Sequence, residues 1–396
     1  MKDPVEKILK LIGEKKITAR DAEKLLESLE ENIDKLPLVL QRETATRRLE
    51  LVESEDKPGY SCFEFDPGKE IYIDLPLQDV EVQGEETGEN RLLFSNNVDK
   101  VTVWEEELSY CIHLTKKEKN NDKFKILVCS AEKSNLVVNG VNGDVKIDGV
   151  NGDIKLKNKT GDIFISNIHE ARLVLNCIDS DINIKDCVSN LEIKTTDGDV
   201  LIEDCEVEGS IYSISGDIEV KASGVDLVVD CYSADSRIEE VTGNIKWKST
   251  SGNLQISDFQ GKLAAYSRAG DIMMKKSSGI IKATSVSGDT KADEITVEKL
   301  QIDTSSGNIN VKPDYLEESA ELKLKTRSGN ILVILPEKTG GTINACSKSG
   351  KVVCNRKLEE KLSEGDNCIS WTLSDNQNVD PPVVELESIL GNIEIK

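Results

Sequence analysis

A nine-residue repeat is the feature that most constrains how this 396-residue chain folds. Gly-Asp or Gly-Asn pairs and a few variants recur from Gly143 to Gly288 at spacings that are multiples of nine, apart from one shift of a single residue. After each pair, apolar residues alternate with polar ones, as in Ile154/Leu156. This alternation predicts a half-buried strand, and Gly beside Asp or Asn predicts a tight turn, because these residues tolerate positive φ.

Each repeat is therefore expected to be one short strand and one corner, and such a unit cannot bury its apolar side alone. Stacking of neighbouring units predicts a mainly β fold, a β-solenoid of roughly nine-residue strand-turn units. A sandwich needs no fixed nine-residue period, and propeller blades repeat at about 40 to 50 residues. The pair Asp186-Cys187 recurs as Asp204-Cys205 two repeat units later, which predicts that two units make one coil.

The regularity of the pattern changes along the chain. We expect regular β-solenoid repeats at 141–312, and C-terminal β repeats with a cap at 313–396. Residues 60–140 are less regular and are expected to form an irregular β cap or the start of the stack. Irregular sequence is typical of terminal units, because they must cover the open end of the core.

The N-terminal part of the chain, before Tyr60, shows a different pattern. Asp3-Pro4-Val5-Glu6 and Thr18-Ala19-Arg20-Asp21 are typical helix starts, so we expect a small N-terminal α-helical hairpin at 1–30 and a partly helical linker at 31–59. Two short helices bury little surface. Either they cover only each other and the start of the body, or they form a partner-binding or homo-oligomerisation module. The residues predicted to bind the partner share helical spacing and are apolar: Val5, Ile8, Leu9, Ile12, Leu25, Leu26 and Leu29.

The charge is unevenly distributed. The chain has 73 acidic and 50 basic residues, a net charge of −23, whereas residues 1–50 hold 11 of each. An acidic body repels phosphate backbones, so we expect no nucleic-acid partner. No apolar run approaches the roughly 20 residues of a membrane helix, so we expect no transmembrane segment. The N-terminus resembles no secretory signal. We therefore expect a cytoplasmic or membrane-peripheral protein, and an unconventional route to the cell surface stays open.

Few motifs in the sequence indicate catalysis or metal binding. Nonapeptide repeats with paired glycines bind calcium in β-rolls, but the second glycine is missing here, so the repeated Asp residues are interpreted as turn residues. Weak binding of divalent cations stays open. His113 and His169 are the only histidines and lie far apart, and the ten cysteines have no CxxC spacing. We interpret the cysteines as reduced thiols, most of them in the core. No cofactor and no metal site are expected.

The repeats resemble a known family. The Ser-Gly-Asp-Ile units, the stretch Ser328–Pro336 and the Gly-Asn-Ile ending at Gly391 resemble the putative-adhesin family of bacterial β-strand repeats. The head, Ile8–Thr18 with Leu25-Leu26, resembles the short SHOCT-like helical module, and the combination is similar to the LiaX/YvlB type of envelope-stress protein. The resemblance implies a non-enzymatic role in the cell-envelope stress response or in surface interaction, with an envelope-associated protein partner, and it supplies no catalytic residues.

Two other functions are compatible with stacked strands. One is a polymer-forming scaffold that resembles the bactofilins, in which solenoids associate end to end. The other is a β-helix polysaccharide-active enzyme, for which the many carboxylates would supply an acid–base pair. The 7 Tyr, 6 Phe and 3 Trp offer few platforms for sugar stacking, and no long insertion interrupts the repeats to build a cleft. We therefore predict a non-enzymatic binding or structural protein.

Overall fold

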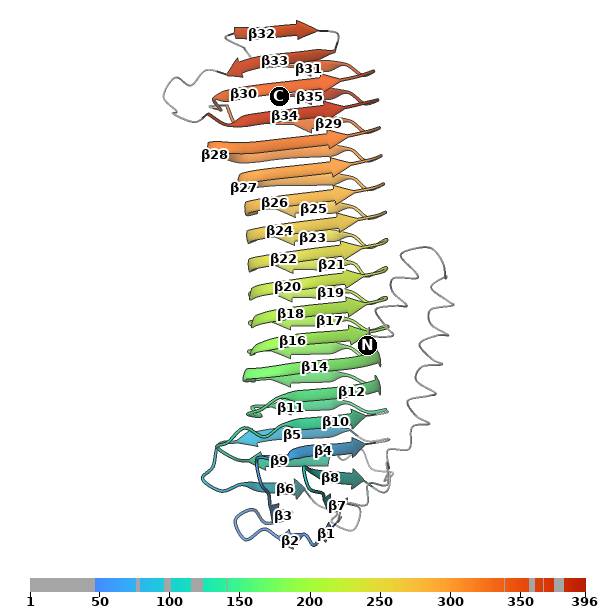
Figure 1. Ribbon diagram of the computed structural model, residues 1–396, viewed down its shortest axis with the longest axis vertical. Helices are drawn as coiled ribbons and strands as arrows, with labels where there is room; N and C mark the ends of the chain where they lie inside the picture. Colours follow the sequence, from blue (N-terminus) through green and yellow to red (C-terminus); the bar gives the residue numbers. More distant parts are fainter. Residues whose placement is uncertain are drawn as a thin grey trace.

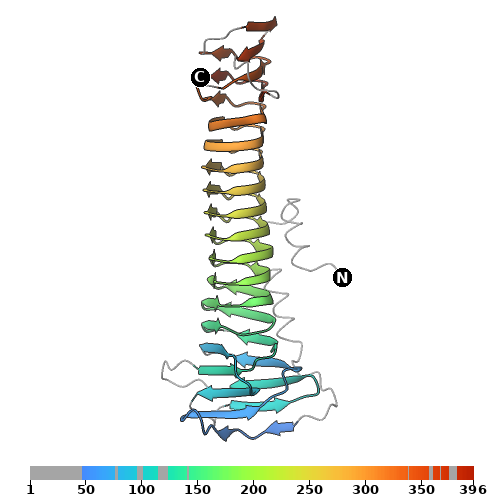
Figure 2. The same cartoon turned by 90° about the vertical axis from the view of Figure 1, so that its left-hand side faces the viewer.

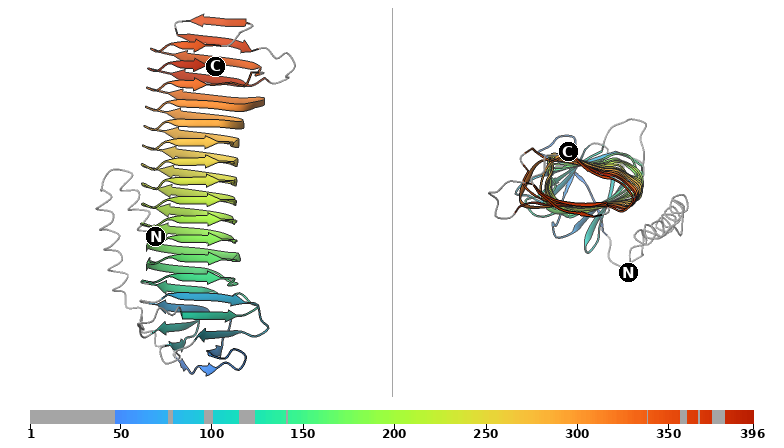
Figure 3. Two further views of the ribbon diagram at one scale, coloured as in Figure 1. Left: turned by 180° about the vertical axis from the view of Figure 1, so that it is seen from behind. Right: turned by 90° about the horizontal axis from the view of Figure 1, so that it is seen from above.

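The computed structural model describes residues 47–75, 79–95, 101–114, 124–140, 142–337, 339–355, 360–365, 367–373 and 381–396. Within these residues every regular element is a strand, from β1 to β35. Most strands stack into a long β-solenoid, with a compact cap at its N-terminal end (Figure 1). The coils follow a straight axis (Figure 2), and a view along that axis shows a flattened, closed tube (Figure 3).

Two layers of parallel strands face each other across the interior of the tube. The longer strands of one layer are β10 (Leu136–Gly140), β12 (Ile154–Thr160), β14 (His169–Asp179), β16 (Val188–Thr195), β18 (Glu206–Ser213), β20 (Gly224–Cys231), β22 (Thr242–Ser249), β24 (Gln260–Ser267) and β26 (Ser278–Ser285). The shorter strands of the other layer are β11 (Val145–Asp148), β13 (Ile163–Ser166), β15 (Ile182–Lys185), β17 (Val200–Glu203), β19 (Ile218–Lys221), β21 (Ser236–Glu239), β23 (Leu254–Ser257) and β25 (Ile272–Lys275). We call these the long-strand layer and the short-strand layer. β27 (Thr290–Thr304) and β28 (Ile309–Thr326) run through a corner and contribute to both layers.

The register confirms the predicted coil length. Val200 of β17 pairs with Ile218 of β19, and Ile211 of β18 pairs with Val229 of β20, so equivalent residues are 18 positions apart. Alternate residues of the strands in the two layers are buried, and the resulting core is continuous from the N-terminal cap to Ile395. The β-solenoid predicted from the nine-residue repeat is therefore confirmed.

The first corner of each coil is the turn from a long strand to the next short strand, and it depends on a small residue. The hydroxyl of Ser267 accepts a hydrogen bond from the Gly270 N–H at 2.8 Å, and the same arrangement recurs at Ser285 and Gly288. A Cβ added to Gly270 would lie 1.9 Å from the carbonyl oxygen of Gly252 in the neighbouring coil. A small residue is needed at this turn because successive coils approach each other so closely there; it is glycine in most coils, and Ser180 and Ala234 in two of them.

The second corner is left-handed in eight successive coils. Its residues have φ between 45° and 56° and are Asn167, Asp186, Asp204, Ala222, Glu240, Asp258, Lys276 and Glu294. Asn and Asp tolerate this conformation better than most residues, whereas a longer or apolar side chain is strained in it. In the four coils that have Ala, Glu or Lys at this position, the left-handed corner is therefore imposed by the geometry of the solenoid and not by the preference of the residue itself.

The N-terminal end is covered by a mixed sheet. Its strands are β1 (Arg47–Leu49), β2 (Val52–Glu53), β3 (Tyr60–Glu64), β4 (Glu70–Leu75), β5 (Val80–Glu85), β6 (Arg91–Ser95), β7 (Val101–Glu105), β8 (Ser109–Leu114) and β9 (Phe124–Cys129). β4 and β5 continue the parallel stack through β10 and β11, and antiparallel pairs such as β3–β6 and β6–β9 follow. A cluster of ring contacts closes the interior at this end: Phe63, Phe65, Phe94, Tyr110 and Phe124.

The C-terminal end does not follow the order of the sequence. Its strands are β29 (Ile331–Val333), β30 (Gly341–Ser347), β31 (Val352–Cys354), β32 (Glu360–Gly365), β33 (Cys368–Leu373), β34 (Val383–Ser388) and β35 (Ile393–Ile395). Ile393 pairs with Ile331 on one side and with Val352 on the other, so the last coil of the chain lies inside the stack. The antiparallel strands β33 and β32 extend the long-strand layer beyond β30.

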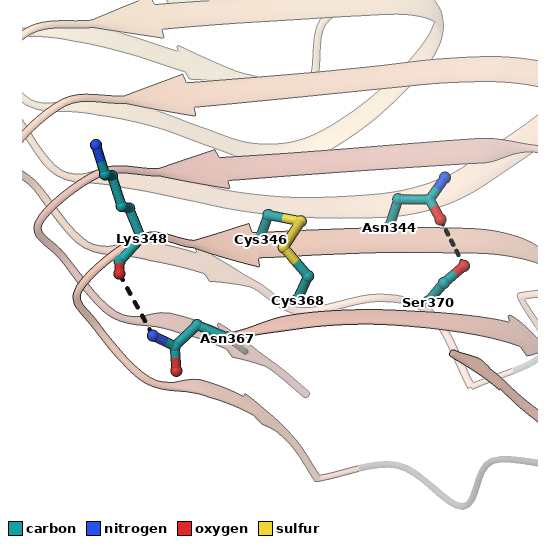
Figure 4. The surroundings of a disulfide bond; sticks show 6 residues. All are labelled: Asn344, Cys346, Lys348, Asn367, Cys368 and Ser370. Atoms are coloured by element: carbon teal, nitrogen blue, oxygen red, sulfur yellow. Dashed lines mark hydrogen bonds between the residues drawn. A yellow bond between two sulfur atoms is a disulfide. The ribbon is translucent and has the colours of Figure 1, made fainter. Parts of the chain in front are cut away.

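A disulfide joins two of the terminal strands. Cys346 of β30 and Cys368 of β33 are opposite each other in the antiparallel register and are bonded (Figure 4). The prediction that the cysteines are reduced thiols is wrong for this pair, because pairing of β30 with β33 brings together residues that are 22 positions apart. In the rest of the described chain the thiols are free, and burial raises the pKa of Cys177 to about 12.

The predicted fold class needs one correction. No helix occurs in the residues that the structure describes, so the fold it establishes is a β-solenoid without the small N-terminal α-helical hairpin. Residues 1–46 lie outside the described residues, and with them all seven predicted partner-binding residues, Val5, Ile8, Leu9, Ile12, Leu25, Leu26 and Leu29. Arg47–Leu49 and Val52–Glu53, within the range predicted as a partly helical linker, form strands because they pair with β7 and β3.

Candidate functional site

A ladder of aspartates runs along the solenoid, one per coil, at the turn that leads into each short strand. Asp144, Asp162, Asp181, Asp199, Asp217 and Asp235 occupy six successive coils, and Asn253, Asp271, Asp289, Asn308 and Asn330 continue the series. In most coils, Oδ1 of the ladder residue accepts a hydrogen bond from the backbone N–H of its counterpart in the next coil. The Asp199 N–H donates to Asp181 at 2.8 Å, and the Asp217 N–H donates to Asp199 at 2.7 Å. The interpretation of the repeated Asp residues as turn residues is confirmed.

An open groove of about 560 Å³ lies beside the first part of this ladder, over strands β13 to β23 of the short-strand layer. Its lining includes outward-facing side chains from the middle of these strands, among them Phe164, Asn183 and Leu201. Six carboxylates line it, together with a single cation, Arg237: the carboxylates are Asp162, Asp181, Asp199, Asp217, Asp235 and Glu219. We call this surface the acidic groove.

The carboxylates of the acidic groove repel one another. Burial, and after it the neighbouring Asp144 and Asp181, raises the pKa of Asp162 above its ordinary value. Burial and the neighbouring Asp199 likewise raise the pKa of Asp217. The cause of the repulsion is the spacing of coils at about 4.8 Å, which stacks like charges. A cation that entered the groove would relieve this repulsion.

Arg237 does not neutralise the groove. Its guanidinium lies 3.8 Å from Glu219 and 3.2 Å from Glu239, and Lys221 also pairs with Glu219 at 3.0 Å, so these cations compensate carboxylates outside the ladder. The five ladder aspartates that line the groove, one in each of five successive coils, therefore keep an excess of negative charge. The arrangement favours ligands that carry several positive charges along an extended shape.

Metal and nucleophilic chemistry have little support in the described ranges. No group of three or more His, Cys, Asp or Glu residues is arranged there to hold a metal ion. His113 Nδ1 lies 3.2 Å from Asp74 Oδ2, and this carboxylate raises the pKa of the imidazole. Cys111 lies two residues before His113 in β8, and burial raises the pKa of its thiol, which disfavours the reactive thiolate. His169 lies at the start of β14 and is exposed.

The sequence analysis missed the acidic groove. Each aspartate is explained by its own turn, and the groove appears only when successive coils are stacked and their outward residues compared. Writing the sequence with one coil in each row would place Asp181, Asp199, Asp217 and Asp235 in one column and show how little positive charge lies beside it. The predicted partner-binding residues of the head are not brought together by the described part of the structure.

A protein-family model for the Toastrack DUF4097 family matches residues 69–239 and 241–396. The chain belongs to this family. No curated protein matches the chain. The matched ranges of this Toastrack protein begin at residue 69, and nothing in the comparisons supports the SHOCT-like module or the LiaX/YvlB type. The described part of the chain has no helix with the length and apolar character that crossing a bilayer requires.

Three solved structures are similar to this Toastrack protein. A putative cell adhesion protein from Clostridium sporogenes is 11% identical, with 86% of this chain and 99% of that chain covered and a TM-score of 0.15. A putative adhesin from Bacteroides fragilis is 16% identical, with 74% of this chain and 98% of that chain covered and a TM-score of 0.22. A putative lipid binding protein from Parabacteroides distasonis is 14% identical, with 85% of this chain and 97% of that chain covered and a TM-score of 0.19. Similarity at this level carries no argument about function.

Proposed function

We propose that this Toastrack protein is a non-enzymatic binding and structural protein, and that its acidic groove binds a basic segment of a protein partner. The observation that carries the proposal is the excess of six carboxylates over one guanidinium in a single open groove. Lys and Arg side chains form charge-assisted hydrogen bonds with carboxylates. Burial raises the pKa of Asp162 and Asp217, and repulsion from neighbouring aspartates adds to it; a cationic segment would offset that repulsion.

The proposal includes a role in surface interaction at the bacterial cell envelope, with an envelope-associated partner. The resemblance of the Ser-Gly-Asp-Ile repeats to bacterial adhesins supports this role, and so does the disulfide between Cys346 and Cys368, because disulfides persist in oxidising compartments. Surface exposure is therefore preferred over the cytoplasmic location expected from the N-terminus. Participation in the envelope stress response is part of the same proposal and rests on the resemblance alone.

The ladder offers a substitution that removes charge and keeps the fold. Asn253 already occupies one of its positions, and its Oδ1 accepts the Asp271 N–H at 2.9 Å as an aspartate would. A variant with Asp181→Asn, Asp199→Asn and Asp217→Asn therefore tests the charge of the groove without removing the acceptors. A control is Asp271→Asn with Asp289→Asn, which removes two charges of the same ladder outside the residues that line the groove.

Binding of a short lysine-rich peptide to the full chain, followed by fluorescence anisotropy at physiological salt, tests the proposal. We expect the groove variant to bind roughly tenfold more weakly, from three ion pairs of about 0.5 kcal/mol each. The control variant should change the affinity less than about twofold, because its charges lie farther from the groove. Equal losses in both variants, or no loss in the groove variant, would overturn the assignment of the binding surface.

The enzymatic alternative has its own measurement. A polysaccharide-active enzyme would turn over an oligosaccharide and would lose that turnover when one carboxylate of its acid–base pair is replaced. We expect no turnover by the unmodified chain with representative envelope polysaccharides. Turnover that a single Asp→Asn substitution in the groove abolishes would replace the binding proposal by the enzymatic one.

A further inference from the structure

A basic surface lies on the long-strand layer of this acidic protein. Strands β22, β24 and β26 together contain four lysines and neither Asp nor Glu. The lysines alternate with buried residues such as Trp247 and are all exposed to solvent: Lys246, Lys248, Lys262 and Lys282. An acid-free run of three successive long strands stands out in a chain with a net charge of −23. We call it the basic island.

The parallel register groups these lysines. Lys246 pairs with Ala264, and Ala264 pairs with Lys282 one coil further on. Tyr266 and Ile280, which are 39% and 37% exposed, lie among the lysines and add apolar contact area. Lys248 forms an ion pair with Asp230 at 3.2 Å, but within the described part of the chain Lys246, Lys262 and Lys282 form none. Three of the four charges are therefore available to a partner.

We propose that the basic island docks on the acidic groove of a second copy of this chain. The inference rests on the proposed function, because it names the partner of the same groove. The two surfaces are complementary in charge, with four lysines and no acid on one side and six carboxylates with one guanidinium on the other. They lie on opposite layers of the solenoid, so one copy can present its island while its own groove remains open.

The spacing of the charges fits the two surfaces together. Both surfaces are built from coils with the same rise of about 4.8 Å, so two solenoids that lie side by side bring cations and carboxylates to matching intervals. The island covers three successive coils, and the groove covers the six coils from Asp162 to Asn253. The groove is thus long enough to receive the whole island.

This contact produces open, lateral assembly. The island and the groove are different surfaces, so the contact is heterologous, and a docked pair keeps one unused island and one unused groove. The assembly differs from end-to-end stacking in its response to salt. Screening of contact ion pairs dissolves a lateral assembly, whereas screening of the overall negative charge promotes association through the ends.

Sedimentation velocity of the full chain at high concentration tests the proposal. We expect the unmodified chain to form dimers and larger species at physiological salt, and these should dissociate at high salt. Lys262→Glu with Lys282→Glu should weaken association at least tenfold, and so should the Asn groove variant. A matched control, Lys157→Glu with Lys312→Glu, makes the same change in net charge at exposed positions outside the island and should associate like the unmodified chain.

A charge exchange gives the sharpest test. Asn183→Lys with Leu201→Lys places positive charge on outward positions of the groove and should abolish self-association. Mixing this variant with the Lys262→Glu, Lys282→Glu variant should restore a heterodimer. An unmodified chain that remains monomeric, an island variant that associates normally, or a mixture without heterodimer would overturn the inference.

The two proposals fail separately. The island variant retains its groove, so it should bind the lysine-rich peptide with unchanged affinity. Peptide binding that depends on the groove aspartates, together with an unmodified chain that stays monomeric, would overturn self-docking and keep the proposed function. Loss of groove dependence in the peptide assay would overturn both.

Discussion

Replacement of Asp217 by Asn is predicted to stabilise the solenoid at neutral pH. Burial and the neighbouring Asp199 raise the pKa of Asp217 above its ordinary value of 3.8. A carboxyl group with a raised pKa in the folded state favours folding when it is protonated, and this contribution is lost as the pH rises from 3.8 through the folded-state pKa. The ionised group therefore lowers stability at pH 7, and the neutral amide removes that effect.

The size of the effect follows from the coil spacing. Two like charges at about 4.8 Å in water repel by roughly 0.9 kcal/mol, and Asp217 has such a neighbour on each side in Asp199 and Asp235. The Asp217 residue is largely exposed although its carboxyl group is partly desolvated, so screening at physiological salt reduces the total of about 1.7 kcal/mol to roughly 1 kcal/mol. The amide accepts the N–H of Asp235 less strongly than the carboxylate does, which leaves a gain of about 0.5 to 1 kcal/mol.

Hydrogen exchange is the suitable assay, because repeat arrays open locally and need not unfold in one step. In peptides that cover β17 and β19, we expect Asp217→Asn to slow exchange roughly two- to fivefold at pH 7 and to have no effect near pH 3. Asp314→Asn, a loss of charge at an exposed residue of β28, is the control. Faster exchange in the variant, or a benefit that persists at pH 3, would refute the reasoning.

Three further variants test the corners and the terminal cap. Lys276→Gly relieves a left-handed residue with φ of 47° and should raise local stability by about 0.5–1 kcal/mol, measured as slower hydrogen exchange in β25 and β26. Gly261→Ala places a Cβ 1.9 Å from the carbonyl oxygen of Gly243 at φ of 146°, so we expect a loss of roughly 2–3 kcal/mol, measured as a lower midpoint of urea unfolding. Cys346→Ser with Cys368→Ser removes a link between positions that are 22 apart and should cost about 3 kcal/mol locally, visible as faster exchange in β33 with no change in β17.

The periodic part of the fold could be predicted because it depends on local pattern. Ile218 and Val220 alternate with polar residues, and Gly216 precedes them, so strand and corner follow from neighbours in sequence. The strand register could be predicted as well, because equivalent residues recur every 18 positions. A slip of one residue would turn the apolar side of a strand to solvent.

The ends of the solenoid could not be predicted in the same way. The unit at Gly391-Asn392-Ile393 has the pattern of every other repeat, and that pattern does not say which coil it joins. Its insertion between Ile331 and Val352 is a long-range choice of partner strands. The N-terminal cap was predicted only as irregular β structure, since its antiparallel pairs are set by the packing of Phe63, Phe94 and the other rings.

The acidic groove was missed for a related reason. Each aspartate is explained by its own turn, so the sequence analysis did not consider the negative charge that these residues add together. The neighbours that complete the groove, such as Phe164 of β13 and Leu201 of β17, come from coils that are separated by a further coil. Only the stacking of coils turns these separate positions into one surface.

At the ladder positions the fold requires an acceptor oxygen and does not require a negative charge. Asn253, Asn308 and Asn330 each accept a backbone N–H through Oδ1, so an amide meets the structural need at this position. Six consecutive aspartates, Asp144 to Asp235, nevertheless stack their charges, and repulsion among them adds to burial in raising the pKa of Asp162 and Asp217. The fold would gain stability from Asn in these coils, and what Asn would lose is the negative charge of the groove. That charge therefore needs a reason outside the folded chain, and a cationic partner that offsets the repulsion on binding supplies one.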